Sequence, residues 1–287
     1  MNTMTTKKGA KKAKRPWWVF AVVGVVAAAL LGVLVFSIGH TPGKKPPAAG
    51  GGIGSPVPAG VLQNLTSIPQ STWAKVTPPS QLAPQVVAST STPTFLYVGA
   101  EGCPYCAAER WAMVVALSRF GRFSHLTMMR SASNDSVSPD TPTFSFYGAT
   151  YKSPYLHADL MEVYGDKLGN QGFYPPLQKL SSAQQALWEK YDAPPYIASQ
   201  NAGSIPFVLV GGRYLWIGSA VPPTLLTGGA WTTLSQEVHG GTRGPGPDVL
   251  ASANALTAAI CASDGSQPTS VCSVPVIQQT LKSWPKS

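Results

Sequence analysis

Hydrophobic residues in this chain fall into short runs between polar and glycine-rich stretches, and one run near the N-terminus is much longer. The run over 94–99, Thr-Phe-Leu-Tyr-Val-Gly, is β-branched and aromatic, which predicts a buried strand. The stretch 107–120 carries large apolar residues at helical spacing and stops at Gly121, which predicts a helix. The first strongly patterned unit is therefore a strand followed directly by a helix.

The middle of the chain predicts weaker elements. Residues 126–129 and 143–147 favour two further strands, and the polar stretch 131–142 between them favours a loop. The segment 153–195 predicts an inserted region that is mostly helical or irregular. Within it, Ser-Ala-Gln-Gln resembles a capping box that opens a short helix over 182–190.

The C-terminal third is strongly patterned again. Two apolar runs, 207–210 and 213–217, flank Gly-Gly and predict a β-hairpin with a two-residue turn. Helical patterns follow over 222–238 and 247–260. The order of strand, helix, strand, long insertion, hairpin and helix predicts an α/β domain with a mixed sheet and flanking helices.

The long apolar run covers 17–38 and has no charged residue, so as a helix it would span about 33 Å, enough to cross a bilayer. Six Lys and Arg residues precede it, which predicts a cytoplasmic basic tail over 1–16 and an extracytoplasmic C-terminal part. A cleaved signal peptide is the alternative, but its apolar region would be shorter. Residues 39–60 are rich in Pro and Gly and predict a linker, which leaves 61–287 as the folded domain.

The net charge of +9 comes mostly from the N-terminus, because eight of the 21 Lys and Arg residues lie within 1–46 and no acid does. The remainder is nearly neutral, so the charge gives no support for nucleic acid as a partner. We expect the lipid bilayer to be a partner, through 17–38. The sequence does not decide the oligomeric state.

The candidate chemistry lies in Cys103-Pro104-Tyr105-Cys106, directly after the predicted strand. A proline fits the first turn of a helix, so the motif predicts two cysteines at a helix N-terminus. Unpaired amides and the helix dipole favour a thiolate there. We expect Cys103, nearer the helix start, to be the attacking thiolate and Cys106 to be the resolving cysteine, with no cofactor required. The further partners that we expect are thiols or disulfides of proteins or small molecules outside the cytoplasm.

A second segment supports this chemistry. Ile205-Pro206 comes directly before the predicted hairpin, where a proline would stand at the start of a strand. In thioredoxin-like folds a cis-proline at this place lies against the two sulfurs. We therefore favour a cis peptide bond here and a substrate groove formed by Pro104, Tyr105, Ile205 and Pro206, although trans is the commoner state.

Longer stretches of the chain resemble one family. These are Gly99–Trp111, which contains the cysteine motif, Thr143–Tyr151, and the closing pattern around Cys261, Pro268 and Cys272. Together they resemble a membrane-anchored, thioredoxin-like family known as domain of unknown function 929. The resemblance implies a thioredoxin-like fold with an insertion, which we place at about 131–200, after one N-terminal transmembrane helix.

The sequence leaves three functional alternatives. A thiol–disulfide oxidoreductase is favoured over a thioredoxin-like binding or assembly module in which the Cys103–Cys106 disulfide is static. A zinc site is the third, but Cys261 and Cys272 are spaced too widely for a usual zinc motif, so we expect no metal. We interpret Cys261 and Cys272 as a structural disulfide, with a second redox pair as the alternative. Glu109 and Arg110 are interpreted as a solvated helix face and Trp111 as a core residue.

Overall fold

The computed structural model describes residues 54–88, 94–169 and 172–285. The predicted tail 1–16, the predicted transmembrane helix 17–38 and most of the predicted linker lie outside these residues. Among the residues that are described, no helix is both long and apolar enough to cross a membrane. The last part of the predicted linker is not free chain, because the Gly54 amide donates to the Met128 carbonyl and the Val57 amide to the Leu126 carbonyl.

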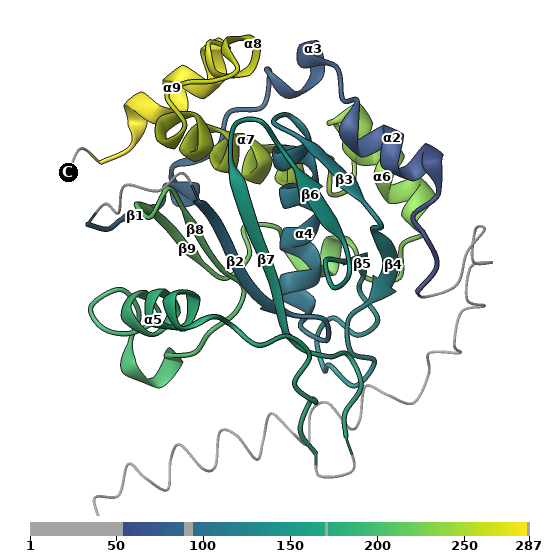
Figure 1. The fold of residues 1–287 in the computed structure, drawn as a ribbon. Coiled ribbons are helices and arrows are strands. Elements are labelled where there is room, and N and C mark those ends of the chain that lie inside the picture. The colour runs from purple at the N-terminus through teal and green to yellow at the C-terminus, as the bar shows by residue number, and fades with distance from the viewer. Residues whose placement is uncertain (1–53, 89–93, 170–171, 286–287) are drawn as a thin grey trace, which may run out of the picture. The chain divides into compact units, whose positions relative to one another are not determined.

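The centre of the fold is a five-stranded mixed sheet in the order β1-β9-β8-β2-β7 (Figure 1). Its strands are β1 (Gln85–Val86), β2 (Thr94–Ala100), β7 (His157–Tyr164), β8 (Phe207–Val210) and β9 (Tyr214–Ile217). β2 runs parallel to β7, and the other pairs are antiparallel. The predicted α/β fold with a mixed sheet and flanking helices is confirmed at this level.

Strand β7 corrects the prediction that 153–195 is mostly helical or irregular. Its eight residues, His-Ala-Asp-Leu-Met-Glu-Val-Tyr, carry four titratable side chains, so no continuous apolar run marks a buried strand. The register pairs Leu160 with Tyr97 and Glu162 with Gly99. Glu162 is buried because a cation from another element meets it there, and a local pattern cannot contain that information.

The two strands predicted over 126–129 and 143–147 do form, but they do not join the central sheet. They pair with each other as β4 (Thr127–Arg130) and β5 (Pro142–Ser145) in a separate two-stranded sheet. A second small sheet pairs β3 (Arg122–Ser124) with β6 (Thr150–Lys152). The alternating polarity of a short segment predicts that it forms a strand. The strand with which it pairs depends on the rest of the fold.

The α-helices of the described residues are α2 (Ala59–Thr66), α3 (Gln70–Trp73), α4 (Pro104–Ser118), α5 (Ser182–Tyr191), α6 (Trp231–Gly240), α7 (Gly246–Ser263), α8 (Thr269–Cys272) and α9 (Pro275–Ser283).

Side chains of β2 and β8 alternate between two hydrophobic cores. Phe95, Tyr97 and Val208 face the larger core with α4 and α7. Leu96 and Phe207 face a smaller core that includes Tyr191 of α5.

Three local predictions need correction. The helix predicted over 222–238 is a short 3₁₀ turn, Pro223–Leu225, followed by α6, since Gly228 and Gly229 interrupt it. The capping box exists one residue earlier than predicted, between Ser181 and Gln184. The hairpin pairs Val210 with Tyr214, so its turn has three residues instead of two.

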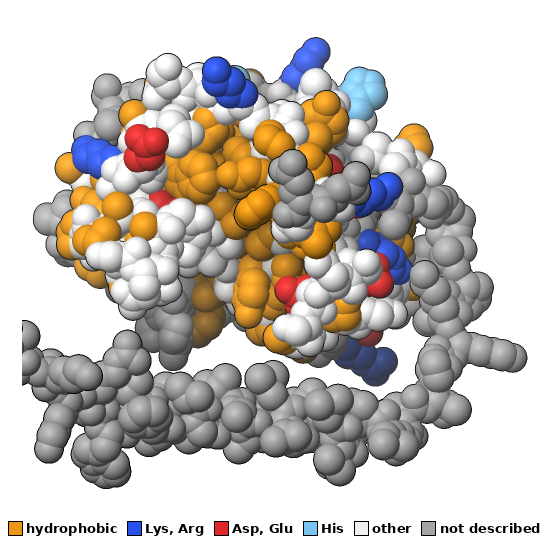
Figure 2. Space-filling model, turned by 90° about the horizontal axis from the view of Figure 1, so that it is seen from below, with side chains coloured by type: hydrophobic (Ala, Val, Ile, Leu, Met, Phe, Trp, Pro, Cys, Tyr) orange, Lys and Arg blue, Asp and Glu red, His pale blue; other side chains and the backbone are white. Residues whose placement is uncertain are grey.

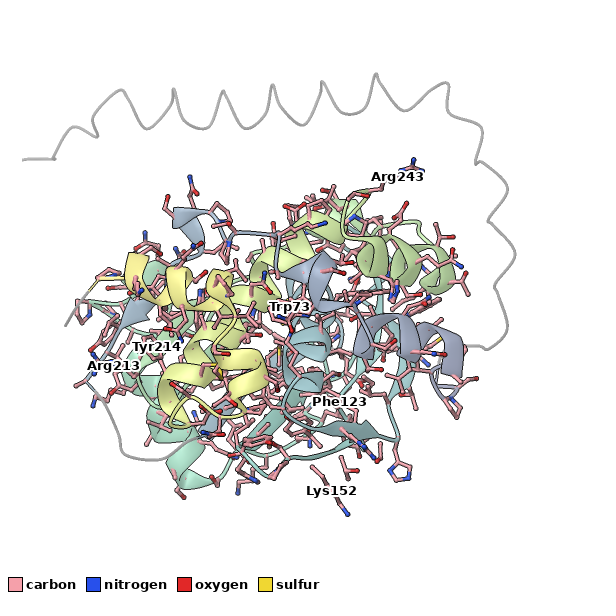
Figure 3. All side chains as sticks on the ribbon, turned by 90° about the horizontal axis from the view of Figure 1, so that it is seen from above. Trp73, Phe123, Lys152, Arg213, Tyr214 and Arg243 are labelled. Carbon is pink, nitrogen blue, oxygen red and sulfur yellow. A yellow bond between two sulfur atoms is a disulfide. The ribbon has the colours of Figure 1, made fainter. Side chains whose placement is uncertain are left out.

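The C-terminal end of α4 contacts neighbouring helices through Arg119. The Arg119 guanidinium lies 4.2 Å from the ring centroid of Trp73, a residue labelled among the helices in Figure 3. Arg119 also donates a 2.6 Å hydrogen bond to Thr257 Oγ1 of α7. The C-terminal end of α4 is therefore held against α3 and α7.

Candidate functional site

The two cysteines of the motif lie at the junction between β2 and α4. Cys103 is the N-cap of α4 and accepts a 3.2 Å hydrogen bond from the Cys106 amide at Sγ. Pro104 is the first residue of the helix, as predicted. Cys106 is fully buried, Cys103 is partly exposed and Tyr105 is half-exposed, so Cys103 is the more accessible sulfur. Both are free thiols in the structure.

The surroundings change the acidity of the two thiols in opposite directions. The pKa of Cys103 is lowered, chiefly because the Cys106 thiol donates to its sulfur; burial opposes this, and backbone amides and the Arg110 charge add to it. Burial raises the pKa of Cys106 well above its ordinary value. Cys103 is therefore the group that ionises first.

The predicted groove residues are brought to the same sulfur. The Cys103 thiol lies 3.9 Å from the Ile205 carbonyl, across 102 residues of sequence. The bond between Ile205 and Pro206 is cis, the state that the sequence favoured. Pro206 directly precedes β8, and its carbonyl oxygen accepts a hydrogen bond from the Gly218 amide. Four predicted residues, Cys103, Cys106, Ile205 and Pro206, thus meet at one end of the sheet.

One helical turn after Cys106, α4 carries one partner of an ion pair that the sequence interpretation missed. Arg110 Nε and Nη2 each donate a 2.8 Å hydrogen bond to the Glu162 carboxylate, and both side chains are fully buried. Arg110 Nη2 also donates to the Ala100 carbonyl at 2.7 Å. The prediction of a solvated Arg110 is wrong, because its position on α4 faces the sheet and β7 supplies the carboxylate.

Glu109 is also buried, contrary to the prediction, but it is engaged elsewhere. Its carboxylate accepts hydrogen bonds from the Ser219 hydroxyl, the Ala220 amide and the Ser252 hydroxyl. Burial raises its pKa, and these three donors lower it. Glu109 therefore ties α4 to α7 and to the segment after β9. Trp111, predicted to be a core residue, is fully buried.

Two loops border the motif, one directly after β7 and one directly after β4. The Gly102 amide donates to the Gly165 carbonyl, and the Gly102 carbonyl accepts the Ala132 amide. Large apolar side chains nearby in the chain are exposed, among them Tyr105, Tyr164, Leu168 and Phe173. Figure 2 looks at the end of the molecule toward which β2 runs, and hydrophobic side chains gather across that face.

Cys261 and Cys272 form a disulfide and are both fully buried. The structure does not bring them to the dithiol. Cys261 lies one helical turn beyond Thr257, the partner of Arg119 at the C-terminal end of α4. The 15 residues of α4 make it about 22 Å long, and Cys103 is at the opposite end.

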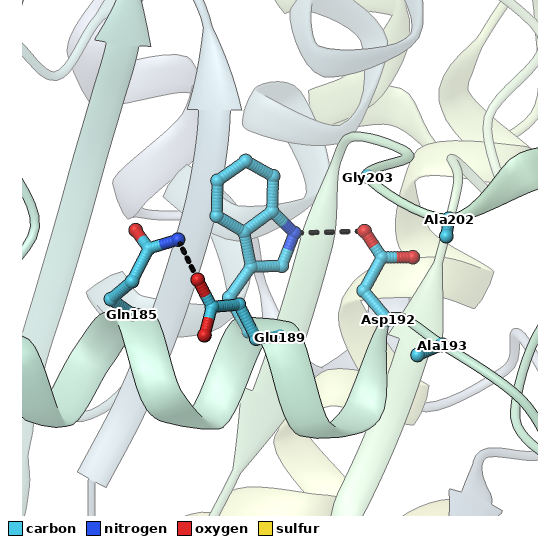
Figure 4. A pocket seen from close by; sticks show the side chains of 7 residues that line it. Gln185, Glu189, Asp192, Ala193, Ala202 and Gly203 are labelled. Carbon is cyan, nitrogen blue, oxygen red and sulfur yellow. Dashed lines mark hydrogen bonds between the residues drawn. The ribbon is translucent and has the colours of Figure 1, made fainter.

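A pocket of about 360 Å³ lies beside α5 (Figure 4). It is lined by Trp188, Glu189, Asp192 and Gly203, among others, and by none of the predicted site residues. Trp188 Nε1 donates to the Asp192 carboxylate at 2.8 Å, and burial raises the pKa of Asp192 to about 6. In the part of the chain that is described, no group of three His, Cys, Asp or Glu side chains could hold a metal ion.

We expect alkylation to separate the two thiols. In the reduced protein, iodoacetamide should label Cys103 first. The labelling rate of Cys103 should rise with pH and reach its plateau before about pH 8.5, the pKa of free cysteine. The Cys106→Ala variant loses the S–H donor, so its rate should level off at a higher pH than in the wild type. Mass spectrometry over a pH series measures both. A profile of Cys103 identical to that of free cysteine in both proteins would contradict this assignment.

Comparison with known sequences covers the same part of the chain. No curated protein and no solved structure is similar enough to match it. The profile of one family, described as "Domain of unknown function (DUF929)", matches residues 78–262. This range is more than half of the chain and includes the dithiol, the ion pair and the Ile205-Pro206 segment, so the chain belongs to the DUF929 family.

Proposed function

We propose that this protein is a membrane-anchored thiol–disulfide oxidoreductase with a thioredoxin-like domain outside the cytoplasm. The observation that carries the proposal is the arrangement of the two sulfurs. Cys103 caps α4, is partly exposed and has a lowered pKa, whereas Cys106 is buried one turn further along. An accessible thiolate beside a buried thiol is the arrangement that two-step disulfide exchange requires.

In the reducing direction, the Cys103 thiolate attacks one sulfur of a substrate disulfide. The substrate S–S bond breaks, its second sulfur leaves and takes up a proton, and a mixed disulfide forms at Cys103. Cys106 then loses its proton and attacks Cys103 Sγ, which releases the substrate as a dithiol and leaves a Cys103–Cys106 disulfide. The oxidising direction is the reverse, and each direction transfers two electrons.

The surroundings of Cys103 suit this exchange. The Ile205 carbonyl lies beside the sulfur, and the half-exposed Tyr105 ring offers an apolar surface next to it. The partners we propose are disulfides or thiols of proteins or small molecules outside the cytoplasm. The membrane anchor is the run 17–38, whose length and flanking charges support a retained helix.

A trapped intermediate tests the proposal. In the full chain, Cys106→Ala removes the resolving thiol, so a protein with accessible disulfides, such as insulin, should accumulate as a mixed disulfide at Cys103. Non-reducing electrophoresis followed by mass mapping identifies the linkage. Cys103→Ala is the matched control and should give no adduct. An absent adduct in Cys106→Ala, or an equal amount in both variants, would favour a static Cys103–Cys106 bridge in a binding module.

A further inference from the structure

The buried Arg110 guanidinium is built into the support of the dithiol. Arg110 follows Cys106 by four residues and Cys103 by seven on α4, so all three lie on one face of the helix. The Ala100 carbonyl accepts both Arg110 Nη2, at 2.7 Å, and the Cys103 amide, at 3.2 Å. One oxygen atom therefore links the cation to the turn that carries the attacking sulfur.

The charge of Arg110 is held in place at considerable cost. Removing a guanidinium from water is unfavourable unless it is paired, and the fully buried carboxylate of Glu162 in β7 accepts two hydrogen bonds from it. The cation is attached to the helix of the cysteines, whereas the anion comes from strand β7. The Arg110 charge lowers the pKa of both thiols, and the Glu162 charge raises the pKa of Cys106.

The other ionisable groups around Arg110 do not replace it. Tyr97 of β2 is fully buried, and burial keeps its hydroxyl protonated by raising its pKa. Glu101 lies near Glu162 and accepts a hydrogen bond from Ser145. Within the described part of the chain, the Arg110 charge acts on both Cys103 and Cys106, and it favours the thiolate of each.

We propose that Arg110 is a positioning residue that holds the turn of Cys103 and, through its charge, stabilises the reduced dithiol against the disulfide, while Glu162 limits this effect. The pair thereby sets the reduction potential of Cys103–Cys106. This inference rests on the proposed function, because a potential has a role only in a dithiol that exchanges. Stabilising the reduced form makes the disulfide a stronger oxidant.

The test is an equilibrium with glutathione in the full chain. Reduction breaks the Cys103–Cys106 bond, forms one S–S bond in glutathione disulfide and transfers two electrons and two protons from two glutathione thiols to the protein. Acid quenching and alkylation give the reduced fraction by mass. Glu162→Gln leaves the cation unbalanced, so the equilibrium constant for reduction should rise by about tenfold, which corresponds to about 30 mV.

The double variant R110Q/E162Q removes both charges and keeps the polar shape of the pair, so it should fold. Its equilibrium constant for reduction should fall below that of the wild type. Glu109→Gln is the matched control, because Glu109 is the neighbouring buried carboxylate on α4 and should leave the constant unchanged. If the pair has a purely structural role, both variants should have a lower melting temperature. Their equilibrium constants for reduction should then not shift in opposite directions.

Shifts of E162Q and R110Q/E162Q in the same direction, or no shift in either, would overturn the inference. The proposed function is judged separately, by turnover of the wild-type protein with a disulfide substrate. An inactive wild type with opposite shifts in the variants would reject the oxidoreductase and keep the electrostatic role of Arg110. An active wild type without such shifts would do the reverse.

Discussion

Replacing Cys103 by serine is expected to abolish thiol–disulfide exchange. A serine hydroxyl keeps the size of the side chain and can still cap α4, so the fold should survive. It does not ionise near neutral pH, so no mixed disulfide can form. Loss of a covalent nucleophile lowers turnover by several orders of magnitude in other enzymes. Insulin reduction by the full chain in the presence of dithiothreitol measures the effect.

A matched control for this variant is removal of the other cysteine pair. The Cys261→Ala/Cys272→Ala variant should lose about 3 kcal/mol of unfolding free energy, because a loop of 11 residues is no longer closed. Its turnover should remain near the wild-type value at temperatures where it stays folded. Loss of turnover in this variant, or normal turnover in Cys103→Ser, would show that the wrong cysteines had been assigned to the reaction.

The largest expected effect on stability comes from a single added methyl group at Gly99. This glycine precedes the motif by four residues in β2, and a Cβ there would overlap the hydroxyl and ring of Tyr97. Tyr97 is fully buried against Phe146 and has no room to turn away. Gly99→Ala should therefore lower the free energy of unfolding by about 3 kcal/mol or more. Urea denaturation followed by tryptophan fluorescence measures it.

Gly60→Ala is the comparison for this variant. Gly60 lies in α2, and a Cβ there meets no atom within 4 Å. Its free energy of unfolding should change by less than about 1 kcal/mol, in the stabilising direction, because alanine favours a helix more than glycine does. Equal effects at positions 60 and 99 would mean that the Tyr97 ring does not occupy the space that the structure gives it.

Local patterns determined a large part of this fold. The run 94–99 forms β2, and the hairpin forms β8 and β9, because each is a compact apolar segment bounded by glycine or proline. The position of Cys103 at a helix start follows from the proline after it. These features depend on residues within a few positions of one another, and so they can be predicted without knowledge of the rest of the chain.

Contacts between distant segments escaped prediction for a physical reason. Strand β7 is half-exposed and carries Glu162, and the partner of this buried carboxylate is Arg110, 52 residues earlier. The pairing of β4 with β5, instead of with the central sheet, likewise depends on which edges the other strands leave open. A charged residue looks solvated in a sequence until the position of its partner is known.

The sequence by itself determined that two thiols stand at the start of a helix after a buried strand, because chain neighbours dictate that junction. Only the tertiary structure decided that one sulfur is accessible and the other buried, that Ile205 lies beside the first, and that a buried ion pair shares the Ala100 carbonyl with the Cys103 amide. Burial and charge at a sulfur depend on side chains from β7, β8 and α4 that meet only when the chain is folded.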